Sequence, residues 1–239
     1  MRTAGISFGL LVVIAAAGMA IAQNQPDPGE VHGLKLGLNA NTMTTDDWGE
    51  LACGSNGGPP RQTLDTWAEF KKCRPEPSGL REVAARFDDE DEYVAKANDN
   101  PLYASQFTGT KVAGHPVILS ALFDDGGILR GIRFMSDPRG TPIERRMAHL
   151  LSVAIMNHYG TDGWTCTDLP AADGETPVGG VFIRQDCSKT TGERAIKIET
   201  RFLRKPGQNG IDPATNEYTE GQFESSTRFE LYDPNYKLP

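Results

Sequence analysis

The sequence predicts an α+β protein built from two helix-plus-antiparallel-sheet modules, each with one disulfide. Three observations predict it: apolar residues at helical spacing precede alternating strands in each half, four cysteines fall into two local pairs, and a short motif recurs at the end of each half. The predicted organisation is a signal peptide at 1–22, an N-terminal module at 23–138 and a C-terminal module at 139–239. A tandem duplication would explain this arrangement.

The first 22 residues have the features of a secretory signal peptide. Arg2 supplies a positive charge, an uncharged and mostly apolar run follows, and Ala20-Ile21-Ala22 is an A-x-A cleavage site before Gln23. The run is short for a membrane-spanning helix, which needs about 20 apolar residues. We therefore expect a periplasmic or secreted protein that begins at Gln23 and does not insert into the membrane after signal removal.

The charge of the chain argues against two classes of partner. The net charge is −8, and removing the +1 of Arg2 with the signal peptide leaves −9. Nucleic acid and anionic lipid are bound chiefly through Lys and Arg. We therefore expect no nucleic-acid partner.

The cysteines predict disulfides rather than a metal site. Cys53 and Cys73 are 20 residues apart, and Cys166 and Cys187 are 21 apart. An exported protein folds in an oxidising compartment, and a zinc site would favour C-x2-C or nearby His spacing, which is missing here. The matching spacings favour local pairing, although four cysteines allow three connectivities.

In the first module, residues 45–52 and 64–73 are expected to form two helices joined by the loop C-G-S-N-G-G-P-P. The loop lacks the Lys of a phosphate-binding P-loop, and Pro59-Pro60 remove amide donors that a phosphate would need. We therefore interpret it as a helix–loop–helix turn, closed by Cys53–Cys73, whose tip could contact a partner. A third helix is expected at 80–87, because its apolar residues recur at i, i+3, i+4 and i+7.

An acidic run follows this third helix, made of Asp88, Asp89, Glu90, Asp91 and Glu92. It could bind calcium or a lanthanide with Asn98, Asp99 and Asn100, but the EF-hand spacing is missing. We favour a solvated acidic junction that opens a helical stretch at 93–97. Residues 115–123 and 128–136 then form the clearest hairpin, around Asp124-Asp125-Gly126-Gly127.

The second module begins with the best helix signal in the chain. Thr141 can cap the helix, Pro142 suits the first helical position and Glu144 completes a capping box. The expected core face contains Ile143, Met147, Leu150, Leu151, Ala154 and His158. Four strands are expected at 164–169, 178–187, 195–204 and 223–232, with one sheet face wet because Ile196 and Ile198 alternate with charged residues.

The recurring motif lies at the end of each half. Arg133-Phe134-Met135-Ser136-Asp137-Pro138 is similar to Arg228-Phe229-Glu230-Leu231-Tyr232-Asp233-Pro234, with a gap of one residue. This similarity is the main sequence support for a duplication.

No catalytic, cofactor or metal residue is predicted. The motifs G-x-S-x-G, S-x-x-K, H-E-x-x-H and C-x-x-C do not occur in residues 23–239, after the predicted signal peptide. A pair of carboxylates could still catalyse glycoside hydrolysis, but nothing in the sequence singles out one pair.

Two segments resemble small periplasmic modules of the BamE/SmpA type. They are the turn Gly33-Leu34-Lys35-Leu36-Gly37-Leu38 before Thr44-Thr45-Asp46-Asp47, and the hairpin around Asp124 to Gly127. The tandem-module β-lactamase inhibitor protein is similar in plan. This resemblance implies protein binding without catalysis.

The predicted function is therefore non-enzymatic binding of a protein partner in the cell envelope. The alternatives are a carboxylate-based hydrolase acting on an envelope polymer and a calcium- or lanthanide-binding protein. Tentative binding residues are Phe223 and Tyr232 on the last strand, beside a long polar loop at 207–222.

Overall fold

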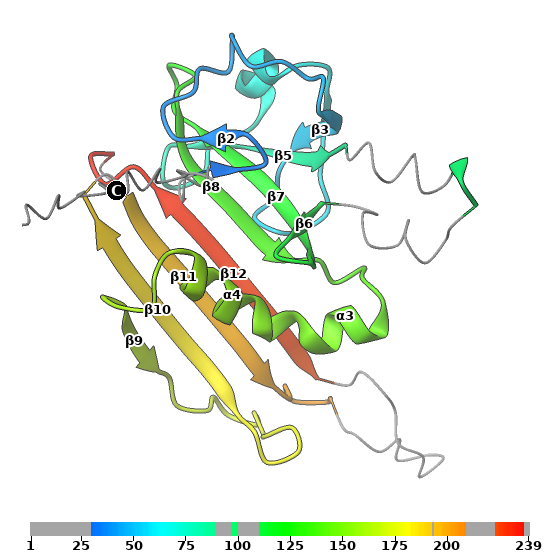
Figure 1. Ribbon diagram of the computed structural model, residues 1–239, viewed down its shortest axis with the longest axis vertical. Helices are drawn as coiled ribbons and strands as arrows, with labels where there is room; N and C mark the ends of the chain where they lie inside the picture. The colour runs from blue at the N-terminus through cyan, green and yellow to red at the C-terminus, as the bar shows by residue number, and fades with distance from the viewer. Residues whose placement is uncertain (1–29, 89–96, 100–109, 193, 209–222, 237–239) are drawn as a thin grey trace, which may run out of the picture.

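One antiparallel sheet organises the molecule. The computed structural model describes residues 30–88, 97–99, 110–192, 194–208 and 223–236 (Figure 1). Within them the strands of the main sheet follow the order β4-β3-β5-β7-β8-β12-β11-β10-β9, and β6 pairs with β7 at the side. The strands are β1 (Glu30–Val31), β2 (Leu34–Lys35), β3 (Trp48–Cys53), β4 (Thr63–Leu64), β5 (Arg81–Phe87), β6 (Lys111–Val112), β7 (His115–Phe123), β8 (Leu129–Ser136), β9 (Thr165–Asp168), β10 (Ile183–Thr191), β11 (Arg194–Leu203) and β12 (Glu224–Tyr232).

This architecture contradicts the predicted α+β fold of two helix-plus-sheet modules. The described chain is mostly β, and strands from both predicted halves share one sheet. The junction is the antiparallel pair of β8 and β12, in which Phe134 lies opposite Phe229 and Arg133 opposite Glu230. The two similar segments are therefore partners in a single sheet.

Two of the expected N-terminal helices are strands. Residues 45–52 overlap β3, and residues 80–87 are largely β5. In β5 the apolar positions fit a helix, but Val83, Ala85 and Phe87 also alternate with Glu82 and Arg86. A seven-residue run is too short for periodicity to separate the two structures. Pairing with β3 and β7 on both sides decides in favour of the strand.

The expected helix at 64–73 is only a short 3-10 helix, η1 (Trp67–Lys72). Trp67 and Phe70 are fully buried, and both rings contact Phe123. The Trp67 ring meets it edge to face with centroids 6.0 Å apart, and the Phe70 ring is tilted against it with centroids 5.6 Å apart. The segment is thus held by its two aromatic anchors and by the disulfide at Cys73 rather than by helical propensity.

The expected hairpin and later strands are correct to within a few residues, except that β10 begins and ends later than expected. β7 matches the prediction at both ends, and β8 begins one residue late. On β11, Ile196 and Ile198 are buried, while Lys197 and Glu199 are exposed, so the wet face is confirmed.

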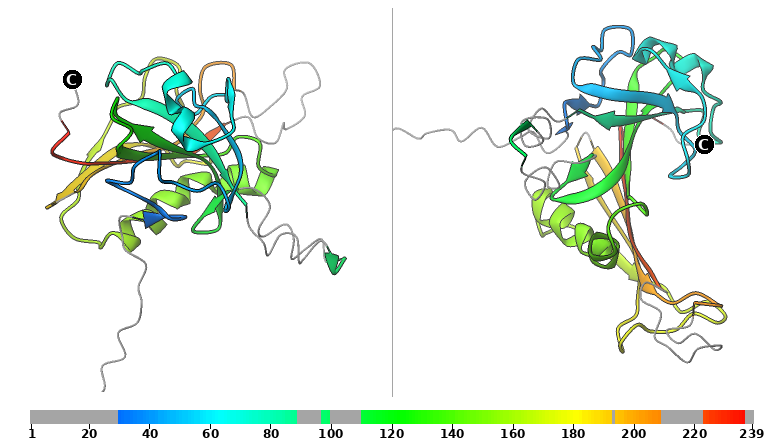
Figure 2. Two further views of the ribbon diagram at one scale, coloured as in Figure 1. Left: turned by 90° about the horizontal axis from the view of Figure 1, so that it is seen from above. Right: turned by 90° about the vertical axis from the view of Figure 1, so that its right-hand side faces the viewer.

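The predicted helix is present as three consecutive segments, α3 (Pro142–Met147), η2 (Ala148–Leu150) and α4 (Leu151–His158). The capping box is confirmed, since the Thr141 side chain accepts from the Glu144 N–H and the Glu144 carboxylate accepts from the Thr141 N–H. The helix lies across one face of the sheet over β11 and β12, whereas the opposite face of these strands carries no helix among the described residues (Figure 2).

The main core lies between the helix, the N-terminal elements and this covered face. Leu151 and Ile155 of α4 meet Ile196, Ile198 and Phe229 there. Tyr159 stacks on Phe229 and Phe229 on Phe134, with ring centroids 5.5 and 4.4 Å apart. These apolar and aromatic contacts hold the helix against the sheet.

Candidate functional site

The helix exposes a stripe of large apolar side chains to solvent. Four of the five large hydrophobic residues that are exposed within the described chain lie on it, and we call them the exposed helix face: Ile143 (72% exposed), Met147 (42%), Leu150 (38%) and Val153 (53%). Their spacing of i, i+4, i+7 and i+10 places them on one side of the helix. Exposed apolar side chains grouped on one side of a helix are typical of interaction sites.

This face corrects the predicted core face of the helix. Ile143, Met147 and Leu150 were expected to be buried with Leu151, and the structure buries only Leu151 of the four. Ile155 and Ala148, on the other side of the helix, complete the buried face. The helix is apolar on two sides, and the sheet covers only one.

Two hydroxyl groups of β12 fix the helix in place. Ser225 Oγ accepts from the His149 backbone N–H at 3.1 Å and donates to the Arg146 carbonyl at 3.0 Å. Thr227 Oγ1 donates to the Ala148 carbonyl at 2.9 Å. The exposed helix face is thus presented by a rigid support.

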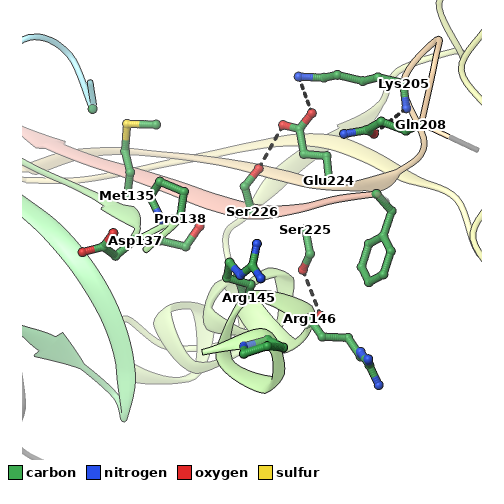
Figure 3. A pocket seen from close by; sticks show the side chains of 15 residues that line it. Met135, Asp137, Pro138, Arg145, Arg146, Lys205, Gln208, Glu224, Ser225 and Ser226 are labelled. Carbon is green, nitrogen blue, oxygen red and sulfur yellow. Dashed lines mark hydrogen bonds and ion pairs between the residues drawn. The ribbon is translucent and has the colours of Figure 1, made fainter. Parts of the chain in front are cut away.

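A pocket of about 430 Å³ opens beside the helix, where β8 and β12 diverge beyond the Met135–Arg228 pair (Figure 3). We call it the fork pocket. Its lining residues are Gly57, Met135, Ser136, Asp137, Pro138, Pro142, Arg145, Arg146, Ala148, Lys205, Gln208, Phe223, Glu224, Ser225 and Ser226. The mixture of apolar walls with a few charged groups is typical of binding pockets.

A second cavity of about 700 Å³ lies next to it on the sheet face opposite the helix. Ala52, Ala84 and Ile118 line it together with the Pro59-Pro60 segment. The two cavities share Gly57, Asp137 and Pro138 in their linings. The glycine-rich loop is therefore a wall of both cavities.

Beneath that loop lies a buried cluster of charged side chains. Arg133 is 5% exposed and pairs with Glu76 at 2.6 Å, Glu230 at 2.8 Å and Glu82 at 3.3 Å. Arg228 pairs with Glu230 as well. Three carboxylates thus face two guanidinium groups.

The carboxylates of this cluster differ in their pKa. Burial raises the pKa of Glu82 above its ordinary value, because it outweighs the opposing charge of Arg133. Burial alone would also raise the pKa of Glu230. The positive charges of Arg228 and Arg133 outweigh it and hold this pKa below its usual value. Glu82 is thus protonated more easily than Glu230, and its Oε1 has no hydrogen-bond partner within the described residues.

The glycine-rich loop covers this charged cluster, and its sequence lacks a phosphate-binding motif. The Asn56 backbone N–H donates to Glu82, and the Asn56 side-chain oxygen accepts from Arg228 at 2.6 Å. Gly54 is required for close packing, since a Cβ there would lie 2.4 Å from the Glu82 side chain. The loop tip, which from the sequence could contact a partner, is therefore hydrogen-bonded to the sheet through Asn56.

The two tentative binding residues have different surroundings. Phe223 lines the fork pocket and contacts Phe202 edge to face, with ring centroids 5.4 Å apart. Tyr232 is 6% exposed, lies against Leu80 and Leu122, and its hydroxyl accepts from Arg133. Burial raises the pKa of Tyr232 to about 12. Tyr232 therefore belongs to the core, and only Phe223 faces a pocket.

Several predicted features lie outside the described residues. They are the signal peptide and Gln23, the acids Asp89 to Glu92 with Asn100, most of the 93–97 helix, and the polar loop from 209 onward. Asp88 is described and half-buried, and no group of three or more His, Cys, Asp or Glu placed to hold a metal ion occurs within the described chain.

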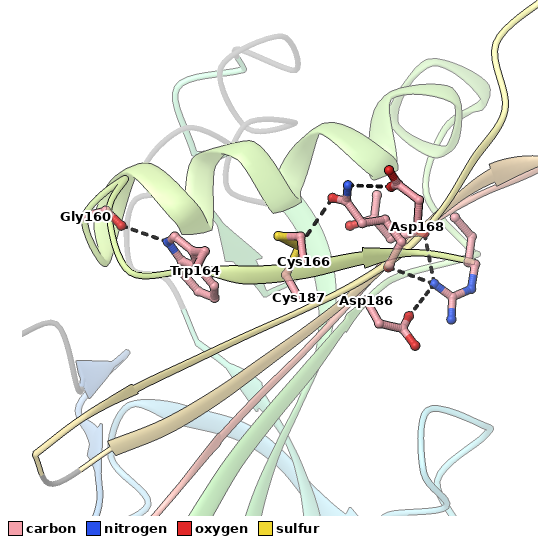
Figure 4. The surroundings of a disulfide bond; sticks show 9 residues. Gly160, Trp164, Cys166, Asp168, Asp186 and Cys187 are labelled. Carbon is pink, nitrogen blue, oxygen red and sulfur yellow. Dashed lines mark hydrogen bonds and ion pairs between the residues drawn. A yellow bond between two sulfur atoms is a disulfide. The ribbon is translucent and has the colours of Figure 1, made fainter. Parts of the chain in front are cut away.

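The disulfides join Cys53 to Cys73 and Cys166 to Cys187, as the spacing predicts. The second bridge links directly opposite residues of β9 and β10 (Figure 4). Trp164, which precedes β9, donates to the Gly160 carbonyl at 2.8 Å, and Lys189 of β10 donates to the same carbonyl. The edge of the sheet is thus tied to the end of α4.

Sequence reasoning missed the exposed helix face and the charged cluster. The first has a signal, because apolar residues in 142–158 occupy more than one side of a helix. The charged cluster also has a signal in the sequence. Arg133 lies between Ile132 and Phe134, and Glu230 lies between Phe229 and Leu231. Each charged residue therefore interrupts an apolar segment of its strand.

Comparisons with protein-family models, with curated proteins and with solved structures find no match to this chain. Among the helices of the described residues, none has both the length and the apolar composition that crossing a bilayer requires. The two disulfides fit an exported protein.

Proposed function

We propose that this protein is an exported, non-enzymatic binding protein and that its exposed helix face binds a protein partner in the cell envelope. The observation that carries the proposal is the stripe of Ile143, Met147, Leu150 and Val153 on a helix whose other side is fixed to the sheet. Complete burial of one such side chain contributes about 1.5–3 kcal/mol. Four together are sufficient for the apolar centre of a small interface.

The charges beside the stripe favour a partner with an acidic rim. Arg145 and Arg146 lie on the same helix, on a protein whose net charge is −8. A second copy packed helix against helix would bring these arginines toward their equivalents, which is unfavourable. A bilayer rich in anionic lipid would be repelled by the rest of the chain.

The proposed partner therefore presents apolar side chains flanked by carboxylates. The rigid attachment of the helix through Ser225 and Thr227 lowers the ordering cost of binding, because the helix is held in place before the partner arrives.

The test is site-specific cross-linking in the envelope. A photoreactive residue replaces Leu150, and the cross-linked peptide of the partner is identified by mass spectrometry. The expected product is a partner peptide that combines apolar and acidic residues, and it is lost when Ile143→Lys and Val153→Lys are introduced together.

The matched control is Val181→Lys, which changes the one exposed large hydrophobic residue away from the helix. It should leave the cross-link unchanged. Cross-linking to a second copy, to lipid alone, or with equal yield in the double variant would contradict the proposal.

A carboxylate-based hydrolase is the second candidate, and the charged cluster is the observation that favours it. Glu82 has a raised pKa beside two further carboxylates, as a general acid requires. Its pairing with Arg133 and the loop above it weigh against access by a polymer. Hydrolysis of peptidoglycan or polysaccharide that is lost in Glu82→Gln would establish this activity.

A further inference from the structure

The fork pocket is cationic on an acidic protein. Its lining includes the positive charges of Arg145, Arg146 and Lys205 and the negative charges of Asp137 and Glu224, which leaves one excess positive charge. The whole chain, in contrast, has a net charge of −8. The pocket therefore favours an anionic ligand.

Both acids of the pocket already have cationic partners. Asp137 accepts from the Arg139 guanidinium at 2.7 Å, and Glu224 pairs with Lys205. Arg145, in contrast, makes no side-chain hydrogen bond or ion pair with any described residue. Its guanidinium points away from the helix toward β12 (Figure 3).

The hydroxyl groups around Arg145 already have other hydrogen-bond partners. Ser225 bonds to the backbone of the helix, Ser226 donates to Glu224, and Ser136 accepts from the Thr227 N–H. The guanidinium has five N–H donors and no acceptor, so its natural partner is an anion with two oxygen atoms.

The remaining walls select for an anion with an apolar stem. Met135, Pro138, Pro142 and Phe223 surround the charged groups. Such walls can contact the apolar part of a bound ligand. A carboxylate on a short apolar chain fits this lining, because its stem can contact the apolar walls while its two oxygen atoms meet the Arg145 guanidinium.

We propose that the fork pocket binds one carboxylate of a peptide, as a Glu or Asp side chain or a chain end, with Arg145 as its partner. The inference rests on the proposed function, because the pocket shares Pro142, Arg145 and Arg146 with the helix that carries the exposed face. Apolar side chains of the partner cover the exposed helix face, and its carboxylate enters the pocket beside it.

The direct test uses small probes rather than the partner. The purified exported protein, labelled with ¹⁵N, is titrated with N-acetyl-leucine, with the neutral N-acetyl-leucinamide and with phenyl phosphate. The expected result is a saturable shift of the Arg145 side-chain Nε–Hε signal and of the Ser226 amide with N-acetyl-leucine. The amide probe gives no such shift.

Arg145→Gln should weaken N-acetyl-leucine binding at least about tenfold, since a charge-assisted hydrogen bond is lost. The matched control is Arg74→Gln, an exposed arginine remote from the pocket, which should leave it unchanged. Equal shifts with the amide probe, binding that survives Arg145→Gln, or no shift at all would overturn the proposal. Tighter binding of phenyl phosphate would overturn the choice of a carboxylate.

The partner assay separates this inference from the proposed function. If Ile143→Lys with Val153→Lys abolishes the cross-link while Arg145→Gln leaves the partner's Kd unchanged, the exposed helix face is the binding surface and the pocket proposal is wrong. If N-acetyl-leucine binds at Arg145 while the helix-face variants keep the cross-link, the pocket is a carboxylate site and the proposed function is wrong.

Discussion

The backbone N–H of Asn56 donates to the buried carboxylate of Glu82 at 2.6 Å. The Asn56 side-chain oxygen accepts from Arg228, so one loop residue is bound by both a negative and a positive group of the sheet. The glycine-rich loop thus covers an internal ionic cluster. Its stability should depend on the charge state of that cluster.

Glu82→Gln should stabilise the protein at neutral pH. Because burial raises the pKa of Glu82, the folded state retains this proton to higher pH than the unfolded state does. The resulting stability is complete below the unfolded pKa and is lost as pH rises through the folded pKa. Glutamine cannot ionise. The free energy of unfolding of the variant, measured with urea, should therefore exceed that of the wild type at about pH 8 and approach it at about pH 4.

Glu230→Gln should have the opposite effect. The pKa of Glu230 is lowered, so its contribution to stability is present above the unfolded pKa and is lost as pH falls through the folded pKa. Removing this charge leaves Arg133 and Arg228 without a shared partner and should cost about 3 kcal/mol at neutral pH. Urea unfolding of Glu82→Gln and Glu230→Gln over the same pH series checks both predictions. If both substitutions changed the free energy of unfolding in the same direction at neutral pH, the opposite pKa shifts of the two carboxylates would be contradicted.

Gly54→Ala should destabilise the protein by about 1–3 kcal/mol through overpacking. The added Cβ would lie 2.4 Å from Cγ and Cδ of Glu82. Gly49→Ala in β3, the strand that ends just before Gly54, is the control, because its Cβ would meet no atom closer than 3.8 Å. Thermal unfolding of both variants checks this, and an equal loss in the two would show that the close approach to Glu82 is not the cause.

Removing Cys53–Cys73 should cost more than removing Cys166–Cys187. Both bridges close loops of similar length, so chain entropy predicts about 3 kcal/mol for each. Cys53 and Cys73 are both buried in the main core, whereas Cys166 is exposed on the edge strand. Replacing each pair by serine and measuring urea unfolding checks the order; a larger loss for the edge pair would contradict it.

The sequence predicted most of the strands from β7 onward well and those before β7 poorly. Strands β11 and β12 are long enough for alternation to be distinct, and the 142–158 helix has a capping box at its start. β5 is short, and its apolar positions fit both periods. Its strand conformation depends on pairing with β3 and β7, which local sequence does not contain.

The candidate site was less predictable because it depends on which elements meet. Local sequence shows that the helix is apolar on two sides, but only the placement of β11 and β12 decides which side is buried. Tyr232 looked exposable near the chain end, yet Arg133 and Leu122 enclose it. Phe223 reaches a pocket only because β8 diverges from β12.

The position of β12 has a consequence for how the chain folds. This last strand in sequence order lies between β8 and β11, so both of these strands keep an unpaired edge until Glu224–Tyr232 has been synthesised. The final closure joins residues about a hundred positions apart, such as Phe134 and Phe229, and such distant pairing is slow. During that interval two open edges are available to other chains, so folding should benefit from a chaperone that shields these edges until β12 is available to pair.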